Sequence, residues 1–191
     1  MKIVLREVCK TYGGHMVLDH VSFTAGEGVT CLMAPSGAGK TTLLRILLGL
    51  ERPDSGAVSG LEGKRLSAVF QEDRLLEHLD ALGNLRFVLG PAFAEETGLG
   101  LLAALGLDGE ARKSVRDWSG GMRRRLALAR ALLAPFDALV LDEPFTGLDG
   151  ENRRRCVDCI RRMAAGKPVL LVTHDAGDAA DLGGRIVSLS V

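Results

Sequence analysis

The stretch from Ala34 to Thr42, reading A-P-S-G-A-G-K-T-T, has the residue types that bind phosphate. It lies between the apolar runs 29–33 and 43–48, so it predicts a glycine-rich turn that joins a strand to a helix. The backbone N–H groups of such a turn point into one concavity, and the helix N-terminus adds positive potential. Lys40 would reach the β- and γ-phosphates of a nucleotide, and the Thr41 hydroxyl would complete a Mg²⁺ shell.

Polar side chains also follow several apolar runs that the sequence predicts to be buried strands. Asp142 and Glu143 come directly after the run from Ala138 to Leu141, while His174 and Gln71 follow two other runs. Because the carboxyl ends of parallel strands meet at one edge of a sheet, these side chains are expected near the phosphate loop. Asp142 would hold Mg²⁺, and Glu143 could polarise an attacking water. The alternative is strands that end in ordinary solvated loops, and an upstream phosphate loop argues against it.

Ser119, Gly120 and Gly121 form a second turn that can bind an anion, at the start of a predicted helix from Met122 to Leu133. A Ser-Gly-Gly turn at a helix N-terminus offers backbone N–H groups and the positive end of the helix dipole. The alternative is an ordinary capped helix start, which the serine alone would explain. Leucines interleave with the arginines of this helix, so we interpret the arginines as a solvated face rather than a nucleic-acid surface.

Two further features have structural explanations that compete with functional ones. Tyr12, the only tyrosine of the chain, lies on a predicted turn. It could be a platform for an adenine ring, or it could simply cover the edge of a core. Cys156 and Cys159 have C-x-x-C spacing, yet no second Cys or His pair stands at zinc-like spacing. We therefore interpret the two cysteines as small apolar residues one helical turn apart.

The composition favours a globular domain rather than a membrane-spanning or nucleic-acid-binding protein. The chain has 191 residues, of which 47% are hydrophobic, and its 24 basic residues balance 24 acidic ones. A nucleic-acid-binding protein would usually have a basic excess, and no apolar run approaches the ~18 residues of a membrane span. The apolar stretch at the N-terminus is too brief for a signal peptide. We therefore expect a cytosolic protein that does not bind nucleic acid.

The elements that would position these residues follow an α/β pattern. Strands over 2–9 and 19–24 predict an antiparallel β element before the phosphate loop, and the Gly- and Pro-rich segment 49–63 predicts a loop and a hairpin. Helical patterns without strand signals come next. The sequence thus predicts one domain, 1–191, with a mostly parallel core sheet from 1–72 and 117–191 and an inserted α-helical subdomain over 73–116.

Taken together, the motifs closely resemble the nucleotide-binding subunit of ABC transporters over essentially the whole chain. In order they are Tyr12, A-P-S-G-A-G-K-T, Gln71, W-S-G-G-M, L-V-L-D-E-P, T-G-L-D and T-H-D. The S-G-G turn, 23 residues before Asp142 (119 to 142), makes the resemblance specific. Within the family the chain is most similar to importers of the nitrate, sulfonate, taurine and bicarbonate group. The resemblance implies a P-loop NTPase fold of ABC type with a RecA-like core.

The resemblance also implies a role for each motif residue. Tyr12 would stack on adenine. Phosphate would be bound by Ser36, Gly37, Ala38, Gly39, Lys40, Thr41 and Thr42, and by Ser119, Gly120 and Gly121 of another subunit. Thr41, Gln71 and Asp142 would contact Mg²⁺. Glu143 would be the catalytic base, His174 the γ-phosphate switch, Gln71 the sensor of a permease, and Asp149 a dimer contact.

These roles imply an ATPase that uses ATP and Mg²⁺ to power solute import. Two copies would close head to tail on two ATP molecules, on the cytoplasmic face of the cell membrane. The partners would be a separate transmembrane permease, which docks on 72–79, and indirectly a solute-binding protein. The alternative is a nucleotide-binding module or soluble ABC ATPase with little turnover and no transport role, since Ala34 replaces the first glycine of the loop. Glu143 and His174 argue against that alternative.

Overall fold

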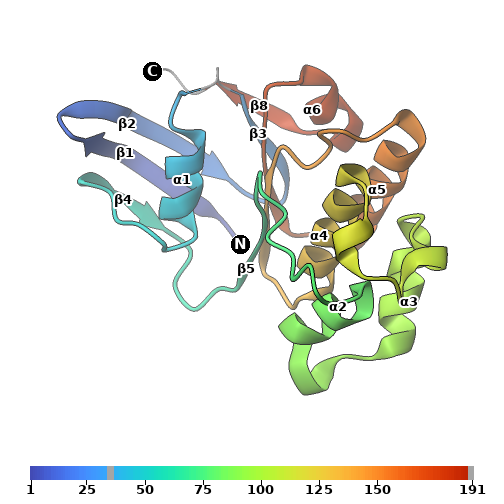
Figure 1. The fold of residues 1–191 in the computed structure, drawn as a ribbon. Coiled ribbons are helices and arrows are strands. Elements are labelled where there is room, and N and C mark those ends of the chain that lie inside the picture. The colour runs from blue at the N-terminus through green and yellow to red at the C-terminus, as the bar shows by residue number, and fades with distance from the viewer. Residues whose placement is uncertain (34–36, 189–191) are drawn as a thin grey trace. The chain divides into compact units, whose positions relative to one another are not determined.

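The computed structural model describes residues 1–33 and 37–188 (Figure 1). The chain forms two compact units, the first from Met1–Leu66, Phe136–Glu143 and Gly166–Val191 and the second from Ser67–Pro135 and Pro144–Ala165. The first unit contains most of the strands, and the second contains most of the helices. The boundaries expected for the inserted subdomain, 73 and 116, stay a prediction.

An antiparallel sheet occupies the N-terminal part of the first unit. Its strands are β1 (Ile3–Tyr12), β2 (His15–Ala25) and β4 (Ser55–Ser59), in the order β2-β1-β4. This is the antiparallel element that the sequence predicts, with longer strands. Tyr12 ends β1 rather than standing in a turn. The turn itself is Gly13-Gly14, whose φ angles of 54° and 80° suit a two-residue hairpin connection.

The hairpin predicted within 49–63 is wrong. That segment supplies the single strand β4, which pairs with β1 in an antiparallel register that places Val58 opposite Leu5. Glycine and proline mark where a chain turns, but they do not identify the strand with which the next segment will pair. The pairing partner lies about fifty residues away in sequence, so only the tertiary fold determines it.

The second sheet has five strands in the order β5-β6-β7-β3-β8. They are β3 (Gly28–Met33), β5 (Leu66–Val69), β6 (Ala138–Asp142), β7 (Pro168–Thr173) and β8 (Arg185–Ser188). β3 pairs in parallel with β7 and β8, and β6 pairs in parallel with β7. Every residue of β6 and β7 is buried. This explains their continuous apolar runs, because a parallel strand covered on both faces shows no alternation.

Helices belong to both units. The first unit has α1 (Lys40–Leu47) and α6 (Ala176–Leu182). The second has α2 (Ala81–Leu89), α3 (Glu95–Ala104), α4 (Gly120–Leu133), α5 (Gly150–Met163) and the 3₁₀ turns η1 (Gly90–Ala92), η2 (Asp108–Glu110) and η3 (Val115–Asp117). Aspartates cap the starts of three of them: Asp80 accepts from the Gly83 N–H, Asp149 from the Asn152 N–H and Asp175 from the Gly177 N–H. Such caps satisfy backbone donors that a helix start leaves unpaired.

The two cysteines of the C-x-x-C pair lie on the buried face of α5. Cys156 is 0% exposed and Cys159 is 2% exposed, and both are free thiols. Burial raises the pKa of the Cys156 thiol to about 12, so this sulfur stays protonated and unreactive. The interpretation as core residues agrees with this burial. In 1–33 and 37–188, no helix has both the length and the apolar character needed to cross a membrane.

Candidate functional site

The parallel strands of the first unit end at one edge of the sheet. Met33, the last residue of β3, lies opposite Thr173 at the end of β7, and Asp142 at the end of β6 lies opposite Val172. The phosphate loop therefore leaves the sheet at the same edge as Glu143 and the residue after β7. This is the edge at which open α/β sheets bind their ligands.

Two glycines of the phosphate loop are required by its geometry. Gly37 and Gly39 have φ angles of 85° and 73°, which side-chain-bearing residues rarely adopt. A Cβ on Gly39 would also lie 2.5 Å from the backbone oxygen of Val17. Ala34 and Ser36 lie outside the described residues, so the phosphate contact of Ser36 and the cost of Ala34 stay predictions.

The start of α1 presents the remaining residues of the loop. Lys40 is the first residue of the helix and is followed by Thr41, which is exposed, and Thr42, which is half-buried. Among the described residues, no side chain caps this helix start. The backbone donors and the positive end of the helix are thus directed at the position where the loop would hold phosphate. Ala38 is buried, so it would contribute its backbone rather than its methyl group.

Tyr12 lies next to the first turn of α1. Hydrogen bonds link its hydroxyl to Glu51 and Thr42, and the bond to Glu51 is the main reason that the pKa of Tyr12 is raised. Tyr12 is 44% exposed, and the Lys10 ammonium lies 5.5 Å from the centroid of its ring. A half-exposed aromatic ring beside a phosphate loop suits stacking on a base better than covering a core edge. The stacking of Tyr12 on adenine stays a prediction.

The Glu143 carboxylate contacts two residues at the end of β7. Its Oε1 lies 2.7 Å from Nδ1 of His174, and its Oε2 lies 3.2 Å from Oγ1 of Thr173. The Glu143 side chain is 14% exposed, and its backbone φ is 49°. For a residue with a Cβ this left-handed conformation costs roughly 1–2 kcal/mol. Such strain is typical of functional sites, where the surrounding fold holds one side chain in place.

Thr173 has one hydroxyl hydrogen for two carboxylate acceptors. Its Oγ1 lies 2.5 Å from Oδ2 of Asp178, closer than the 3.2 Å to Glu143, and Thr173 and Asp178 are both buried. The shorter distance assigns the hydrogen to Asp178. His174 is therefore the side chain that donates to Glu143. Because an ionised carboxylate only accepts, Nδ1 of the histidine carries the hydrogen.

The hydrogen bond from His174 to Glu143, followed by the charge of Glu143, raises the pKa of the histidine. A raised pKa in the folded state means that the charged pair is fully formed below the ordinary value of about 6.5. The pair is lost as the pH rises through the raised value. Because His174 is exposed, its raised pKa mainly changes the charge beside the phosphate loop and has little effect on the stability of the fold.

We expect Glu143→Gln to return the pKa of His174 towards its ordinary value, because the substitution removes the carboxylate charge. A histidine titration followed by NMR, with His174→Asn to assign the resonance, measures this change. The pKa of His20 is raised by its own partner Asp19, so His20 should titrate identically in the wild type and in Glu143→Gln. An unchanged midpoint for His174 would show that its partner is not Glu143.

The Ser-Gly-Gly turn begins α4 in the second unit. The Ser119 Oγ accepts a hydrogen bond of 3.3 Å from the Met122 N–H, so the capped helix start considered above is present. The cap uses the serine oxygen only as an acceptor, and its hydroxyl hydrogen can still be donated to an anion. The turn lines a cavity of the same unit together with Arg124, Arg125 and the segment 146–149. A helix cap and an anion site are compatible here.

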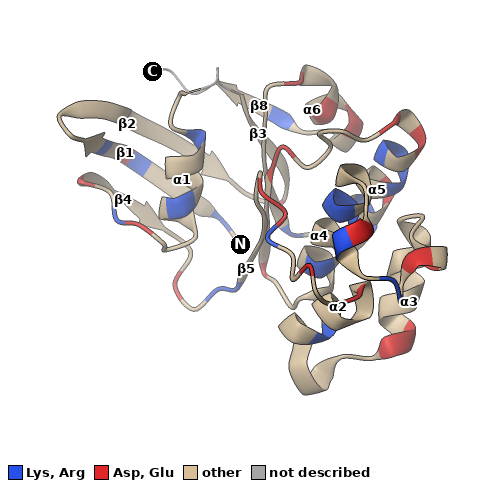
Figure 2. Ribbon diagram, viewed as in Figure 1, with Lys and Arg blue, Asp and Glu red and all other residues tan. Residues whose placement is uncertain are grey.

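Two buried arginines of α4 contradict the solvated face that the sequence suggests. Figure 2 shows basic residues along α4 and α5. Arg124 is 6% exposed and donates to the backbone oxygens of Phe70 and Gln71, both at 2.5 Å. Arg125 is 7% exposed and donates to the Leu105 oxygen at 2.7 Å. The sequence did not predict the burial of these arginines. Their guanidinium groups bind backbone carbonyls, and no residue pattern in the sequence identifies such partners.

Arg124 gives the segment around Gln71 a fixed backbone. The same guanidinium lies 3.2 Å from the Asp73 carboxylate, and Arg130 donates to the Asp73 backbone oxygen at 2.9 Å. The Gln71 side chain is exposed, so it can contact a ligand. Gln71 thus follows β5 in the second unit, on a backbone that hydrogen bonds hold in place. Glu143 and His174 belong to the first unit.

The residues available for Mg²⁺ have suitable chemistry. Mg²⁺ prefers oxygen ligands and keeps several waters. In the first unit the hydroxyl of Thr41, exposed on α1, and the carboxylate of Asp142, buried at the end of β6, provide such oxygens. Bound there, the ion would neutralise the charge on phosphate oxygens. Asp142 and Thr41 would hold it, and the Mg²⁺ contact expected of Gln71, which belongs to the second unit, stays a prediction.

Comparison with known proteins points to a single family. The family model described as ABC transporter matches residues 18–146. An aliphatic sulfonates import ATP-binding protein of Rhodococcus jostii is 42% identical, over 94% of this chain and 75% of its own length. A Fe(3+) ions import ATP-binding protein of Streptomyces coelicolor is 41% identical, over 92% and 56%. A dimeric structure of a bacterial ABC transporter cassette is 28% identical, over 98% and 94%, with a TM-score of 0.86.

Proposed function

The chain belongs to the ABC transporter family, and we propose that it binds ATP in a site shared between two copies and hydrolyses it to drive a membrane permease. The observation that carries this proposal is the contact of Glu143 with His174, at the sheet edge where the phosphate loop begins. A carboxylate held by a histidine beside a phosphate loop suits a general base for attack on the γ-phosphate. The pair argues against a module that only binds nucleotide.

Each copy would supply a different half of the site. In the first unit, Lys40 and Thr41 would hold the phosphates and Mg²⁺, and Tyr12 would stack on adenine. The Ser119 turn of a second copy would close over the γ-phosphate, with Asp149 at the dimer contact. The pKa of Asp149 is lowered by its hydrogen bonds, first that from the Asn152 N–H, so this carboxylate stays ionised. The dimeric structure of the related cassette supports this arrangement.

Mixing two inactive variants tests whether the site is shared. Lys40→Ala disables the phosphate loop, and Gly120→Asp places a carboxylate where phosphate would bind. A Cβ on Gly120 meets no atom of the described residues within 4 Å, so the second variant should fold. In a mixed dimer one site combines both lesions and the other has neither. Random pairing should therefore restore about a quarter of the wild-type Mg-ATP turnover, measured as phosphate release. A mixture that stays inactive would contradict the shared site.

The surface for the permease would be the segment 72–79 of the second unit. Buried Asn84 fixes this segment, because its side chain accepts from the Leu76 N–H at 2.8 Å and donates to the Leu76 oxygen at 3.0 Å. Arg123 pairs with Glu77 at 3.1 Å. Phe87 and Val88 of α2, in the same unit, are 70% and 46% exposed. A backbone segment fixed by hydrogen bonds, in a unit that also has exposed apolar side chains, suits docking of a partner helix.

The transported solute would be selected by the partners of this chain. Relatives with almost the same identity, 42% and 41%, are named for aliphatic sulfonates and for Fe(3+) ions. The same type of ATPase subunit thus serves chemically different cargo. We place the chain on the cytoplasmic side of a membrane, where ATP and a permease would both be available.

A further inference from the structure

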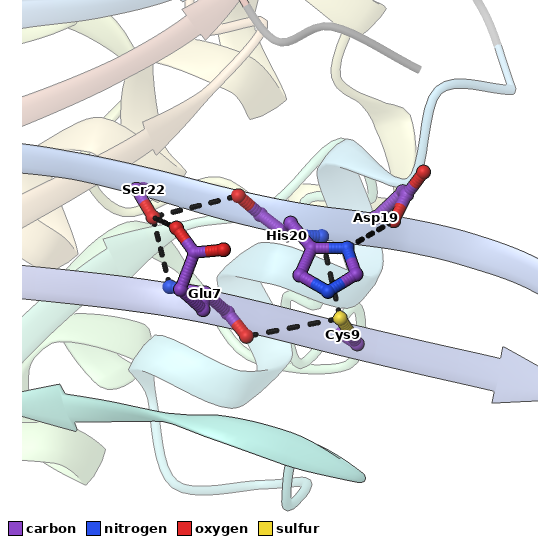
Figure 3. A network of polar contacts seen from close by, with 5 residues as sticks. All are labelled: Glu7, Cys9, Asp19, His20 and Ser22. Carbon is purple, nitrogen blue, oxygen red and sulfur yellow. Dashed lines mark hydrogen bonds and ion pairs between the residues drawn. The ribbon is translucent and has the colours of Figure 1, made fainter.

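A group of polar side chains lies between the first two strands of the antiparallel sheet. Figure 3 shows Cys9 on β1 facing Asp19 and His20 on β2, with Glu7 and Ser22 beside them. One ligand atom each from Cys9, Asp19 and His20 lies within 4.8 Å of the other two. The three atoms are a thiol sulfur, a carboxylate oxygen and an imidazole nitrogen. None of them has a part in the proposed ATP site.

Two opposed irregularities of the β1–β2 ladder create this group. From the pair Leu5–Phe23 to the pair Val8–Val21, β1 advances three residues while β2 advances two. From there to the pair Lys10–Leu18, β1 advances two residues while β2 advances three. Between Leu5 and Lys10 each strand therefore has one extra residue, and the two bulges restore the register; a third irregularity follows between Lys10 and Thr11. Bulges redirect side chains and are common beside functional sites.

The bulges hold unusual backbone conformations. Glu7 and His20 have φ angles of 49° and 46°, in the left-handed region that disfavours side chains. His20 thereby turns its backbone N–H to the Cys9 sulfur at 3.3 Å and its ring Nδ1 to the Asp19 carboxylate at 2.5 Å. An ordinary ladder would place successive side chains on opposite faces of the sheet. The left-handed backbone therefore brings the sulfur, the carboxylate oxygen and the imidazole nitrogen close together.

A second pair of residues supports the group. The Ser22 hydroxyl donates to a Glu7 carboxylate oxygen at 2.6 Å, and the Glu7 N–H donates to the Ser22 oxygen at 2.8 Å. The Glu7 backbone oxygen accepts from the Cys9 thiol at 3.7 Å. Both the backbone and the side chain of Glu7, the bulged residue of β1, are thus bonded to Ser22 of β2. Supporting hydrogen bonds of this kind orient the donors of metal sites.

We propose that Cys9, Asp19 and His20 form a binding site for a zinc-class divalent cation. A sulfur, a nitrogen and a carboxylate oxygen are the ligands that Zn²⁺ takes in proteins, and a set containing thiolate excludes Mg²⁺ and Ca²⁺ as the preferred ions. Ligands of a tetrahedral zinc lie roughly 3.5 Å apart. The exposed side chains of Asp19 and His20 can close the difference from 4.8 Å by rotating.

The alternative explanation of this group is a surface ion pair between Asp19 and His20 that happens to lie next to a core thiol. Cys9 is 8% exposed, whereas the other three cysteines, 31, 156 and 159, are 0–2% exposed. In the folded protein, Cys9 is therefore the most exposed of the four thiols, and an added ion can reach it beside the exposed side chains of Asp19 and His20. A spectroscopic signal from a metal–thiolate bond separates the two explanations.

Co²⁺ as a probe for the zinc site gives that signal. The nucleotide-free chain, in buffer without chelators or thiols, is titrated with Co²⁺, and the near-ultraviolet thiolate-to-cobalt absorption is recorded. We expect the band to saturate at one Co²⁺ per chain and to disappear when Zn²⁺ is added. The band should be absent in Cys9→Ser, and His20→Asn should weaken Co²⁺ binding by more than about tenfold.

Folding controls keep the test decisive. Asparagine tolerates the left-handed backbone of position 20 better than histidine does, so His20→Asn should fold even if Cys9→Ser does not. His15→Asn removes another exposed histidine of the same hairpin and should bind Co²⁺ as the wild type does. The proposal is overturned if the wild type shows no thiolate band, or if the band is unchanged in His20→Asn.

Discussion

Glu143→Gln is expected to lower Mg-ATP turnover by about 10²- to 10⁴-fold while leaving ATP binding intact. The substituted side chain would keep its shape and could still contact His174, but an amide cannot accept the proton of an attacking water. Because hydrolysis is the step that reopens the proposed dimer, the variant should accumulate as an ATP-bound dimer. Phosphate release measures turnover, and light scattering at saturating Mg-ATP measures the dimer.

Glu27→Gln is the matched control for this substitution. Glu27 is an exposed carboxylate of the same unit, in the turn before β3, and its loss should change neither turnover nor the dimer. If the wild type were as slow as Glu143→Gln, the chain would be a nucleotide-binding module rather than an enzyme. A variant that stayed monomeric at saturating Mg-ATP would contradict the sandwich dimer for the isolated chain.

Lys40→Ala should weaken the affinity for ATP by roughly 10- to 100-fold. The lysine is the first residue of α1, directly after the left-handed Gly39, so its ammonium group would donate to the β- and γ-phosphates. Hydrogen bonds to charged groups contribute about 1.5–3 kcal/mol, and each ~1.4 kcal/mol is tenfold in affinity. Titration calorimetry with ATP in the presence of Mg²⁺ measures the change.

Two comparisons show whether the loss comes from the phosphates. Adenosine lacks phosphates and should bind Lys40→Ala and the wild type alike, since Tyr12 would make its main contact. Lys64→Ala removes an exposed lysine of the same unit and should bind ATP normally. If Lys40→Ala bound ATP with unchanged affinity, the phosphate loop would not be the nucleotide site.

The sequence alone indicated the chemistry of the ATP site, because that chemistry depends on local backbone form. A glycine-rich turn between an apolar strand and a helix is suited to bind phosphate, and Gly37 and Gly39 have the positive φ angles that this turn needs. Asp142 and His174 were placed at strand ends by the apolar runs before them. The fold class followed from the same runs, since fully apolar strands alternating with helices predict a parallel sheet.

Only the tertiary structure decided which distant residues meet. The Glu143–His174 pair joins residues 31 positions apart, and Arg124 binds the Gln71 oxygen 53 positions away. β4 pairs with β1 rather than with a neighbouring strand. The cluster at Cys9, Asp19 and His20 depends on two bulges that no local pattern announces. Local propensity fixes how a segment folds, but the register between strands and the partners of buried polar groups are set by packing across the whole chain.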